Sequence, residues 1–321
     1  MFHFKNPWVP GGFVGVDLFF AISGYVITRS LVRELDSTST VSLTQFYSRR
    51  FRRIFPAAAV AIAGALLLLS ISVGLRMVDA YAAAALLSGT LNLFLTNGSL
   101  YNSSFVHLWS LSVEEQFYAL WPACFFLLRN KHRRWLAAVA GVVLLGSLTW
   151  TVYLTGAGVS WMRTYFAPDT RAAGLLAGCL LGSVGTGGCP KLLVHTWPVP
   201  LAVLVWLAVT FNNHDKSMGY GGFALASLAS VWLIAVAAEN SGNPLGRLLA
   251  HPVAQWIGLR SYSVFLWHFT LGQAFHYVGL SLWVALGCAL IVADLSYRFV
   301  ERPFLNIWGR EATAREAPVV P

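Results

Sequence analysis

Long apolar stretches constrain the fold of this chain more than any other feature of its sequence. A helix needs about 20 consecutive, mostly apolar residues to cross the hydrocarbon core of a membrane. Nine stretches approach this length, at residues 13–31, 54–74, 108–128, 135–155, 171–187, 197–212, 220–238, 261–279 and 280–298. The sequence therefore predicts an all-α, polytopic transmembrane helix bundle with about nine to ten spanning helices.

Composition excludes an ordinary soluble domain. Hydrophobic residues make up 57% of the chain and charged residues only 11%, whereas a soluble domain carries about 25% charged residues. The net charge of +9 would suggest nucleic acid as a partner in a soluble protein. Here the basic residues lie in short loops between apolar stretches, where the positive-inside rule accounts for many of them. We therefore expect contact with membrane lipid and no nucleic-acid partner.

The distribution of Lys and Arg predicts the orientation. The richest loops, at residues 29–53 and 129–134, are cytoplasmic by the positive-inside rule. Every loop agrees with this rule if the apolar stretch 79–95 does not cross the membrane. We therefore predict that 79–95 is a re-entrant or interfacial segment and that the amino terminus lies outside. Four widely spaced cysteines form no CxxC pair, so neither a disulfide nor a metal site is expected.

Ionisable side chains at membrane depth are costly and therefore mark functional candidates. Asp17 and Ser23 interrupt the first apolar stretch, in a segment rich in glycine. Close helix packing explains the glycines, but it does not explain Asp17.

A basic segment, Phe46 to Pro56, contains four arginines: Arg49, Arg50, Arg52 and Arg53. One interpretation is topogenic charge that also attracts anionic lipid. The other is a cradle for a phosphorylated donor, since guanidinium groups offer forked, always-charged donors to phosphate. Both interpretations can hold together.

Two adjacent carboxylates, Glu114 and Glu115, lie at the edge of the stretch 108–128. On a helix, His107, Ser110, Glu114 and Tyr118 would fall on one side, because residues three and four apart share a face. The carboxylates are either buried ion-pair partners for arginines or part of a polar reaction chamber.

Further polar groups accompany the later stretches. Arg171 follows Asp169 closely, which predicts an interfacial ion pair or a contact with an anionic group. His268 lies within the stretch 261–279. It either bonds a neighbouring helix or binds substrate.

These motifs resemble the acyltransferase 3 family of membrane O-acyltransferases. The resemblance runs from GGFVGVDLFFAISGYVIT through FYSRRFRRIFP and HLWSLSVEEQFYALWP to DTRAAGLLAG, RSYSVFLWHF and RFVERPF. It implies a ten-helix bundle in a bacterial cytoplasmic membrane that takes an acyl group, here acetyl, from acyl-CoA as donor substrate. No tightly bound cofactor and no metal are implied. The acceptor would be a hydroxyl of a surface polysaccharide, lipopolysaccharide, peptidoglycan or glycoside.

The resemblance also implies residue roles. The family's first helix carries a basic residue eleven positions before an essential histidine, which His3 matches. The basic residue would precede residue 1, so we expect either a longer reading frame or a truncated, inactive relative. The expected domain is 1–308, truncated at its amino terminus, followed by a disordered cytoplasmic tail at 309–321.

On this hypothesis His3 is the general base or takes the acyl group transiently, and Glu114 and Glu115 orient it or bind acceptor hydroxyls. The CoA phosphates would be held by Arg49, Arg50, Arg52 and Arg53. Substrate would be bound by Asp17, Ser23, Ser110, Arg171 and His268. Two other classes remain open: a transporter, since intramembrane charges also mark ion pathways, and an inactive binding protein.

Overall fold

The computed structural model describes residues 9–72, 74, 76–185, 195–239, 243–277, 279 and 281–306. Every regular element in this part of the chain is helical, which confirms the predicted all-α class. The chain divides into two compact units. The first comprises Met1–Val41, Ser88–Tyr101 and Trp109–His251, and the second comprises Ser42–Leu87, Asn102–Leu108 and Pro252–Pro321.

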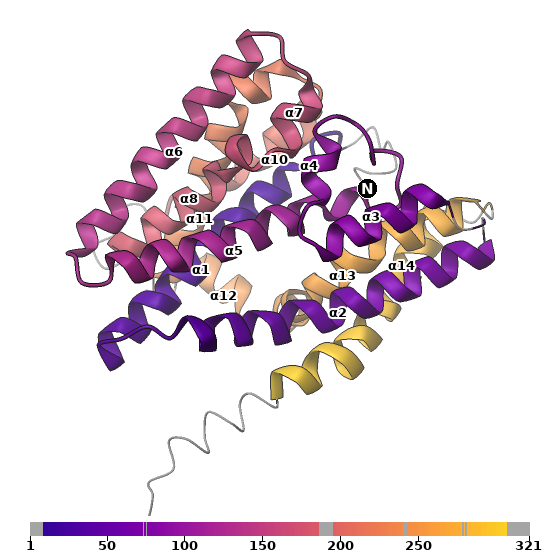
Figure 1. Ribbon diagram of the computed structural model, residues 1–321, viewed down its shortest axis with the longest axis horizontal. Coiled ribbons are helices and arrows are strands. Elements are labelled where there is room, and N and C mark those ends of the chain that lie inside the picture. The colour runs from indigo at the N-terminus through magenta and orange to yellow at the C-terminus, as the bar shows by residue number, and fades with distance from the viewer. Residues whose placement is uncertain are drawn as a thin grey trace, which may run out of the picture. The chain divides into compact units, whose positions relative to one another are not determined.

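Nine helices of the first unit are described (Figure 1): α1 (Val14–Thr38), α4 (Leu91–Leu95), α5 (Trp109–Leu128), α6 (Arg133–Gly156), α7 (Trp161–Phe166), α8 (Pro168–Val184), α10 (Pro198–Thr210), α11 (Phe223–Ala238) and α12 (Pro244–Leu249). A π-helical turn, Met218–Gly222, precedes α11. The second unit contains α2 (Leu43–Ser72), α3 (Met77–Leu87), a 3-10 turn (Val106–Leu108), α13 (Pro252–Tyr277), α14 (Leu282–Ser296) and a π-helical turn (Tyr297–Glu301).

Each of the nine predicted stretches coincides with a helix, but fewer helices can cross a membrane by length and composition. Within the described residues there are five: α1, α2, α6, the segment Met218–Ala238 and the segment Trp283–Asn306. The 13 residues of α10 extend only about 20 Å at 1.5 Å per residue, less than the ~30 Å hydrocarbon core. A total of nine to ten crossings therefore stays a prediction.

The segment 79–95 is not one continuous helix. Helix α3 ends at Leu87, and α4 begins at Leu91 after a turn in which Gly89 has a φ of +67°. The 11 residues of α3 extend about 16 Å, too short to span a bilayer. The break separates the two units, since Leu87 ends a part of the second and Ser88 begins a part of the first.

Helices α1 and α8 form the closest contact in the first unit. A Cβ atom added at Gly24 of α1 would lie 1.9 Å from the carbonyl oxygen of Leu175. A Cβ at Gly178 of α8 would lie 2.1 Å from the carbonyl oxygen of Ala21. Gly174 and Gly182 continue the same face of α8 at four-residue intervals. Small residues at this spacing allow two helix backbones to touch, as in many membrane helix pairs.

Helices α2, α13 and α14 form the body of the second unit. The hydroxyl of Tyr262 on α13 donates a hydrogen bond to the carbonyl of Ile54 on α2, at 3.0 Å. The Trp267 ring packs against Gly64, where an added Cβ would come within 2.5 Å of it. Arg260 of α13 bonds Asp294 of α14. Aromatic packing and polar contacts thus join α13 to both α2 and α14.

Substituting Gly178 by alanine should destabilise the first unit, because the added methyl overlaps the backbone of α1. Overpacking costs about 1–3 kcal/mol, and rigid backbone neighbours should place this variant near the upper end. The thermal unfolding midpoint of the purified protein in detergent measures the effect.

Gly146→Ala on α6 is the matched control, since an added Cβ there meets nothing within 4 Å. Its midpoint should equal or exceed that of the unchanged protein, because alanine favours helix over glycine by about 1 kcal/mol. Equal midpoints for the two variants would contradict a close α1–α8 contact.

Candidate functional site

A buried ion pair joins α1 to α8. The Nη2 atom of Arg171 lies 3.0 Å from Oδ1 of Asp17, and both side chains are almost fully enclosed. The close α1–α8 contact produces this geometry, since Arg171 precedes Gly174 by one turn and Asp17 precedes Ala21 by one turn. Two residues expected to bind substrate are therefore brought together.

The predicted pairing of Arg171 with Asp169 is wrong. Both residues lie in the first turn of α8, and residues two apart on a helix point in different directions. Asp169 points outward and pairs with Arg163 of α7, whereas Arg171 points inward to Asp17. The local sequence suggested the nearer acid, but the helix geometry selects the distant one.

Aromatic rings enclose the Arg171 guanidinium. Its Cζ atom lies 3.9 Å from the centre of the Phe223 ring, 5.3 Å from that of Tyr165 and 5.7 Å from that of Trp109. Cation–π attraction is strongest in such desolvated settings, at about 2 kcal/mol or more. We call Trp109, Tyr165 and Phe223 the aromatic cage. Sequence reasoning missed all three, because nothing in their spacing links them to Arg171.

The guanidinium is not saturated by these contacts. Among the described residues, its Nε and Nη1 atoms have no hydrogen-bond partner, although the side chain is only 1% exposed. A buried charged donor without a partner is costly, so such groups usually contact water or a ligand. The free N–H groups of Arg171 are therefore candidate donors to a substrate oxygen.

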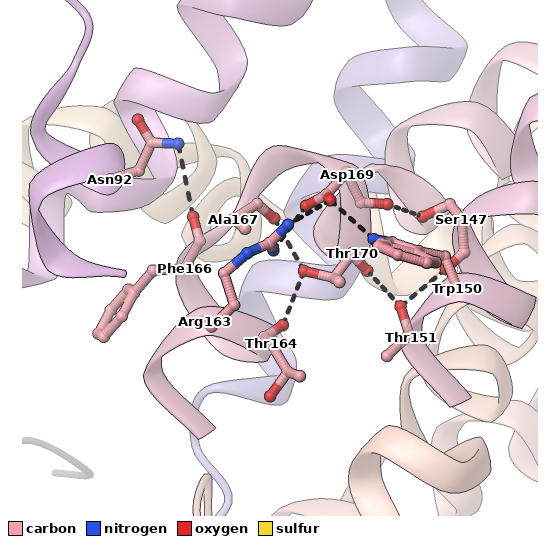
Figure 2. A network of polar contacts seen from close by, with 10 residues as sticks. All are labelled: Asn92, Ser147, Trp150, Thr151, Arg163, Thr164, Phe166, Ala167, Asp169 and Thr170. Carbon is pink, nitrogen blue, oxygen red and sulfur yellow. Dashed lines mark hydrogen bonds and ion pairs between the residues drawn. The ribbon is translucent and has the colours of Figure 1, made fainter. Parts of the chain in front are cut away.

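A polar network fixes the corner between α7 and α8 that carries Tyr165 and Arg171 (Figure 2). Arg163 binds both carboxylate oxygens of Asp169, and the Trp150 indole of α6 donates to the same carboxylate at 2.9 Å. Thr170 closes the corner by donating to the carbonyl of Thr164 at 2.8 Å. Ser147 and Thr151 of α6 donate to the backbone carbonyls of Asp169 and Thr170. Helix α6 is thus the frame that positions the corner.

Arg163 and Asp169 each shift the pKa of the other. Partial burial alone would raise the pKa of the Asp169 carboxyl, but the hydrogen bonds from Arg163 and Trp150 prevail and lower it. The same hydrogen bond to Asp169 raises the pKa of the Arg163 guanidinium. Both groups are therefore charged at neutral pH.

A cavity of about 270 Å³ lies next to the cage, within the first unit. Tyr165 and Phe223 belong both to its wall and to the cage. The remaining lining residues come from the end of α6, from α7 and from the chain around the π-helical turn: Thr155, Gly158, Val159, Ser160, Trp161, Thr164, Asn213, His214, Asp215, Lys216, Met218 and Gly219. Two rings of the cage therefore border both the cavity and Arg171. No sequence motif indicated it.

Helix α5 carries further predicted site residues. Glu114 is buried and Glu115 is partly buried on α5, and a Cβ at Gly89 would lie 2.9 Å from the Glu115 carboxylate. Ser110 is buried, and its hydroxyl has no partner among the described residues. Ser23 of α1 shares a 2.7 Å hydrogen bond with the Tyr118 hydroxyl of α5.

The expected one-sided row that begins at His107 stays a prediction. Helix α5 begins at Trp109, and His107 lies in the 3-10 turn that directly precedes it. His107 also belongs to the second unit, whereas Glu114 belongs to the first.

A second polar contact on α5 was missed. The Gln116 amide donates to the Gly89 carbonyl at 2.7 Å and to the Asn92 side chain at 2.9 Å. Asn92 is fully buried and donates to the Phe166 carbonyl, at the corner shown in Figure 2. An asparagine inside the apolar stretch 79–95 was the available signal.

The second unit contains a pair of histidines. The rings of His107 and His268 are 5.3 Å apart and nearly perpendicular, and Phe269 packs on His107 at 4.7 Å. Nδ1 of His268 lies 2.9 Å from the Phe265 carbonyl of its own helix. That contact places the proton on Nδ1, so Nε2 is the basic nitrogen of the neutral ring. His268 thus bonds its own helix, which neither expected role included.

The remaining predicted residues fall in two places. The four arginines, Arg49, Arg50, Arg52 and Arg53, lie in the first half of α2, and none of them is fully buried. The Arg50 guanidinium lies over the Phe46 ring at 5.8 Å. His3 lies outside the described residues.

Breaking the ion pair should cost about 3–5 kcal/mol of stability, because each single variant leaves an uncompensated buried charge. We expect this loss for Asp17→Asn and for Arg171→Met, measured as the unfolding midpoint in detergent. The double variant should recover at least half of the loss. A double variant whose loss equals the sum of both single losses would show that the two charges do not interact.

Acid should weaken the α7–α8 corner. The pKa of Asp169 is lower in the folded protein than in the unfolded chain. The stability that the Asp169 carboxylate contributes is therefore complete above the ordinary aspartate pKa, near 3.9. It is lost as the pH falls through the lowered pKa of the folded state. The difference in unfolding midpoint between the unchanged protein and Asp169→Asn should shrink as the pH is lowered through this range. A difference that is constant with pH would reject the assignment.

Comparison with known proteins matches residues 2–295 to the acyltransferase domain family. The chain is 32% identical over 335 residues to the O-acetyltransferase OatA of Staphylococcus aureus, covering 94% of this chain and 54% of that protein. It is 30% identical over 330 residues to the peptidoglycan O-acetyltransferase OatA of Listeria monocytogenes, covering 94% and 53%. The chain therefore spans about half the length of these curated relatives. No solved structure matches it.

Both partners of the buried ion pair lie within the matched residues, as do the aromatic cage and the cavity. Because the family match covers most of the sequence, this chain belongs to the acyltransferase 3 family.

Proposed function

We propose that this chain is a membrane O-acyltransferase that moves an acetyl group from acyl-CoA to a hydroxyl of a cell-envelope carbohydrate. The observation that carries the proposal is Arg171, which is buried, fixed by Asp17 and has N–H groups without partners among the described residues. Family membership supports the reaction class, and the name of the Listeria relative supports a glycan acceptor. The bacterial cytoplasmic membrane is the proposed location.

The reaction joins an alcohol to a thioester. The acceptor oxygen attacks the thioester carbonyl, the carbon–sulfur bond breaks, and the CoA thiol leaves with the proton that the alcohol gave up. A base must take that proton, and the carbonyl oxygen must be stabilised while it carries negative charge. His3 is the proposed base or transient acyl carrier.

Arg171 is suited to stabilise the carbonyl oxygen while it carries negative charge. A fixed cation in a dry, aromatic setting stabilises developing negative charge more strongly than in water, because the local dielectric constant is low. Asp17 keeps the guanidinium in one orientation and balances its charge before substrate arrives. Arg171 is therefore the proposed donor to the reacting carbonyl oxygen or to an acceptor oxygen next to it.

The arginines of α2 are the proposed binding site for the acyl-CoA donor. Arg49, Arg50, Arg52 and Arg53 lie on two consecutive turns of one helix, in the loop region predicted to be cytoplasmic. Guanidinium groups bind phosphate through forked hydrogen bonds, which matches the phosphates of CoA. Glu114 and Glu115 are proposed to orient the base or to bind acceptor hydroxyls, while Ser23, Ser110 and His268 are proposed substrate contacts.

Membranes containing the protein, incubated with radiolabelled acetyl-CoA and envelope glycan, should transfer label to the glycan. Arg171→Ala should lower the rate by about 10²–10³, the loss typical of removing one donor to a developing oxyanion. The double variant Asp17→Asn with Arg171→Met should be equally inactive although its stability is largely restored.

Arg133→Ala is the control, because that arginine is exposed and pairs with Asp36 rather than with Asp17. Its rate should stay close to that of the unchanged protein, since exposed ion pairs contribute little. Full activity of Arg171→Ala would remove the proposed role of Arg171. Failure of the unchanged protein to label any glycan would reject the acyltransferase assignment and favour a transporter.

A further inference from the structure

The 270 Å³ cavity beside the aromatic cage has the features of a sugar-binding site. Trp161, Tyr165 and Phe223 give it aromatic walls, while Ser160, Thr155, Thr164 and Asn213 supply hydroxyl and amide groups. The apolar C–H face of a pyranose packs against rings, and its hydroxyls need hydrogen-bond partners. Small-molecule sites combine apolar walls with a few placed polar groups in the same way.

The volume of the cavity and the charges around it restrict the class of ligand that it can bind. Small-molecule pockets typically measure about 300–1,000 Å³, so this smaller cavity suits one ring. The charged residues around it largely cancel, since Lys216 adjoins Asp215 and Arg163 pairs with Asp169. A neutral ring therefore fits better than an anionic group.

The wall of the cavity is held in place before any ligand arrives. The Trp161 and His214 rings lie 4.1 Å apart. Asn212 accepts a hydrogen bond from the backbone N–H of His214 at 2.9 Å, and Asp215 accepts one from the backbone N–H of Ser217 at 3.0 Å. Ser160 caps α7 by accepting from the N–H of Met162. Preorganised walls reduce the entropic cost of binding.

The membrane orientation points to the acceptor rather than the donor. The loops that line the cavity, around residues 157–160 and 212–217, are poor in net positive charge. The positive-inside rule therefore predicts that they lie outside the cytoplasm. An envelope glycan reaches that side of the membrane, whereas acyl-CoA is cytoplasmic.

We propose that this cavity binds a neutral pyranose ring of the carbohydrate acceptor, beside the rings of Tyr165 and Phe223 that also contact Arg171. This inference rests on the proposed O-acyltransferase function and names the site at which that function takes its acceptor. The shared residues Tyr165 and Phe223 would link occupation of the cavity to the environment of the Arg171 guanidinium.

Binding of a short linear oligomer of N-acetylglucosamine to the purified full chain in detergent tests the proposal without any catalytic step. Saturation-transfer NMR titration should show binding, and Trp161→Ala should weaken it at least tenfold. Trp161→Phe should keep most of the affinity, because a ring remains. Trp135→Ala is the matched control: it removes an exposed tryptophan at the other end of α6 and should change nothing.

Two further variants change exposed residues, so that a loss of affinity in them cannot be explained by unfolding. Val159→Trp should fill the cavity and His214→Ala should remove a ring from its rim, and both positions are exposed, so the unfolding midpoints should not change. Both variants should lose affinity. Higher salt should leave binding unchanged, since a neutral ligand is not screened. Tighter, salt-sensitive binding of an oligomer of uronic acid would overturn the assignment to a neutral ring.

Kinetics separate this inference from the proposed function. In Trp161→Ala and Val159→Trp, the KM for the glycan should rise at least tenfold, whereas in the control Trp135→Ala it should not change. Unaltered oligomer affinity in both variants would overturn the sugar site even if acetyl transfer stands. Absence of acetyl transfer in the unchanged protein, with oligomer binding that depends on Trp161, would reject the enzyme and keep the site.

Discussion

The backbone contact between α1 and α8 brings the two buried charges of the first unit, Asp17 and Arg171, within reach of each other. In lipid, helices gain little from the hydrophobic effect when they associate, so close packing and polar contacts must hold them together. Gly24 and Gly178 remove the side chains that would keep the two backbones apart. Asp17 and Arg171 then meet one turn away, where their charges compensate each other. Packing and electrostatics support the same pair of helices.

The aromatic cage connects this ion pair to the rest of the unit. Tyr165 and Phe223 contact the guanidinium and also line the cavity. Their position depends on the corner between α7 and α8, which α6 holds through Ser147, Trp150 and Thr151. A ligand in the cavity would therefore contact two of the rings that enclose the Arg171 guanidinium.

The second unit presents different chemistry. Four of its arginines, Arg49, Arg50, Arg52 and Arg53, lie along α2 where that helix is partly exposed, which suits contact with phosphate or lipid headgroups. Its histidines, His107 and His268, pack among phenylalanines inside the unit. The arginines of α2 are thus partly exposed, whereas the His107 imidazole is buried.

The sequence by itself determined the helical class, the places of the helices and the family. Apolar stretches and ionisable residues within them are local features, and local features can be read without a fold. It also identified Asp17 and Arg171 as residues that do not belong in lipid. The tertiary structure alone decided that they pair with each other, because helix geometry turns Arg171 away from Asp169. The cage and the cavity depend on residues far apart in the chain, whose approach only the packing of α1, α6, α7, α8 and α11 could produce.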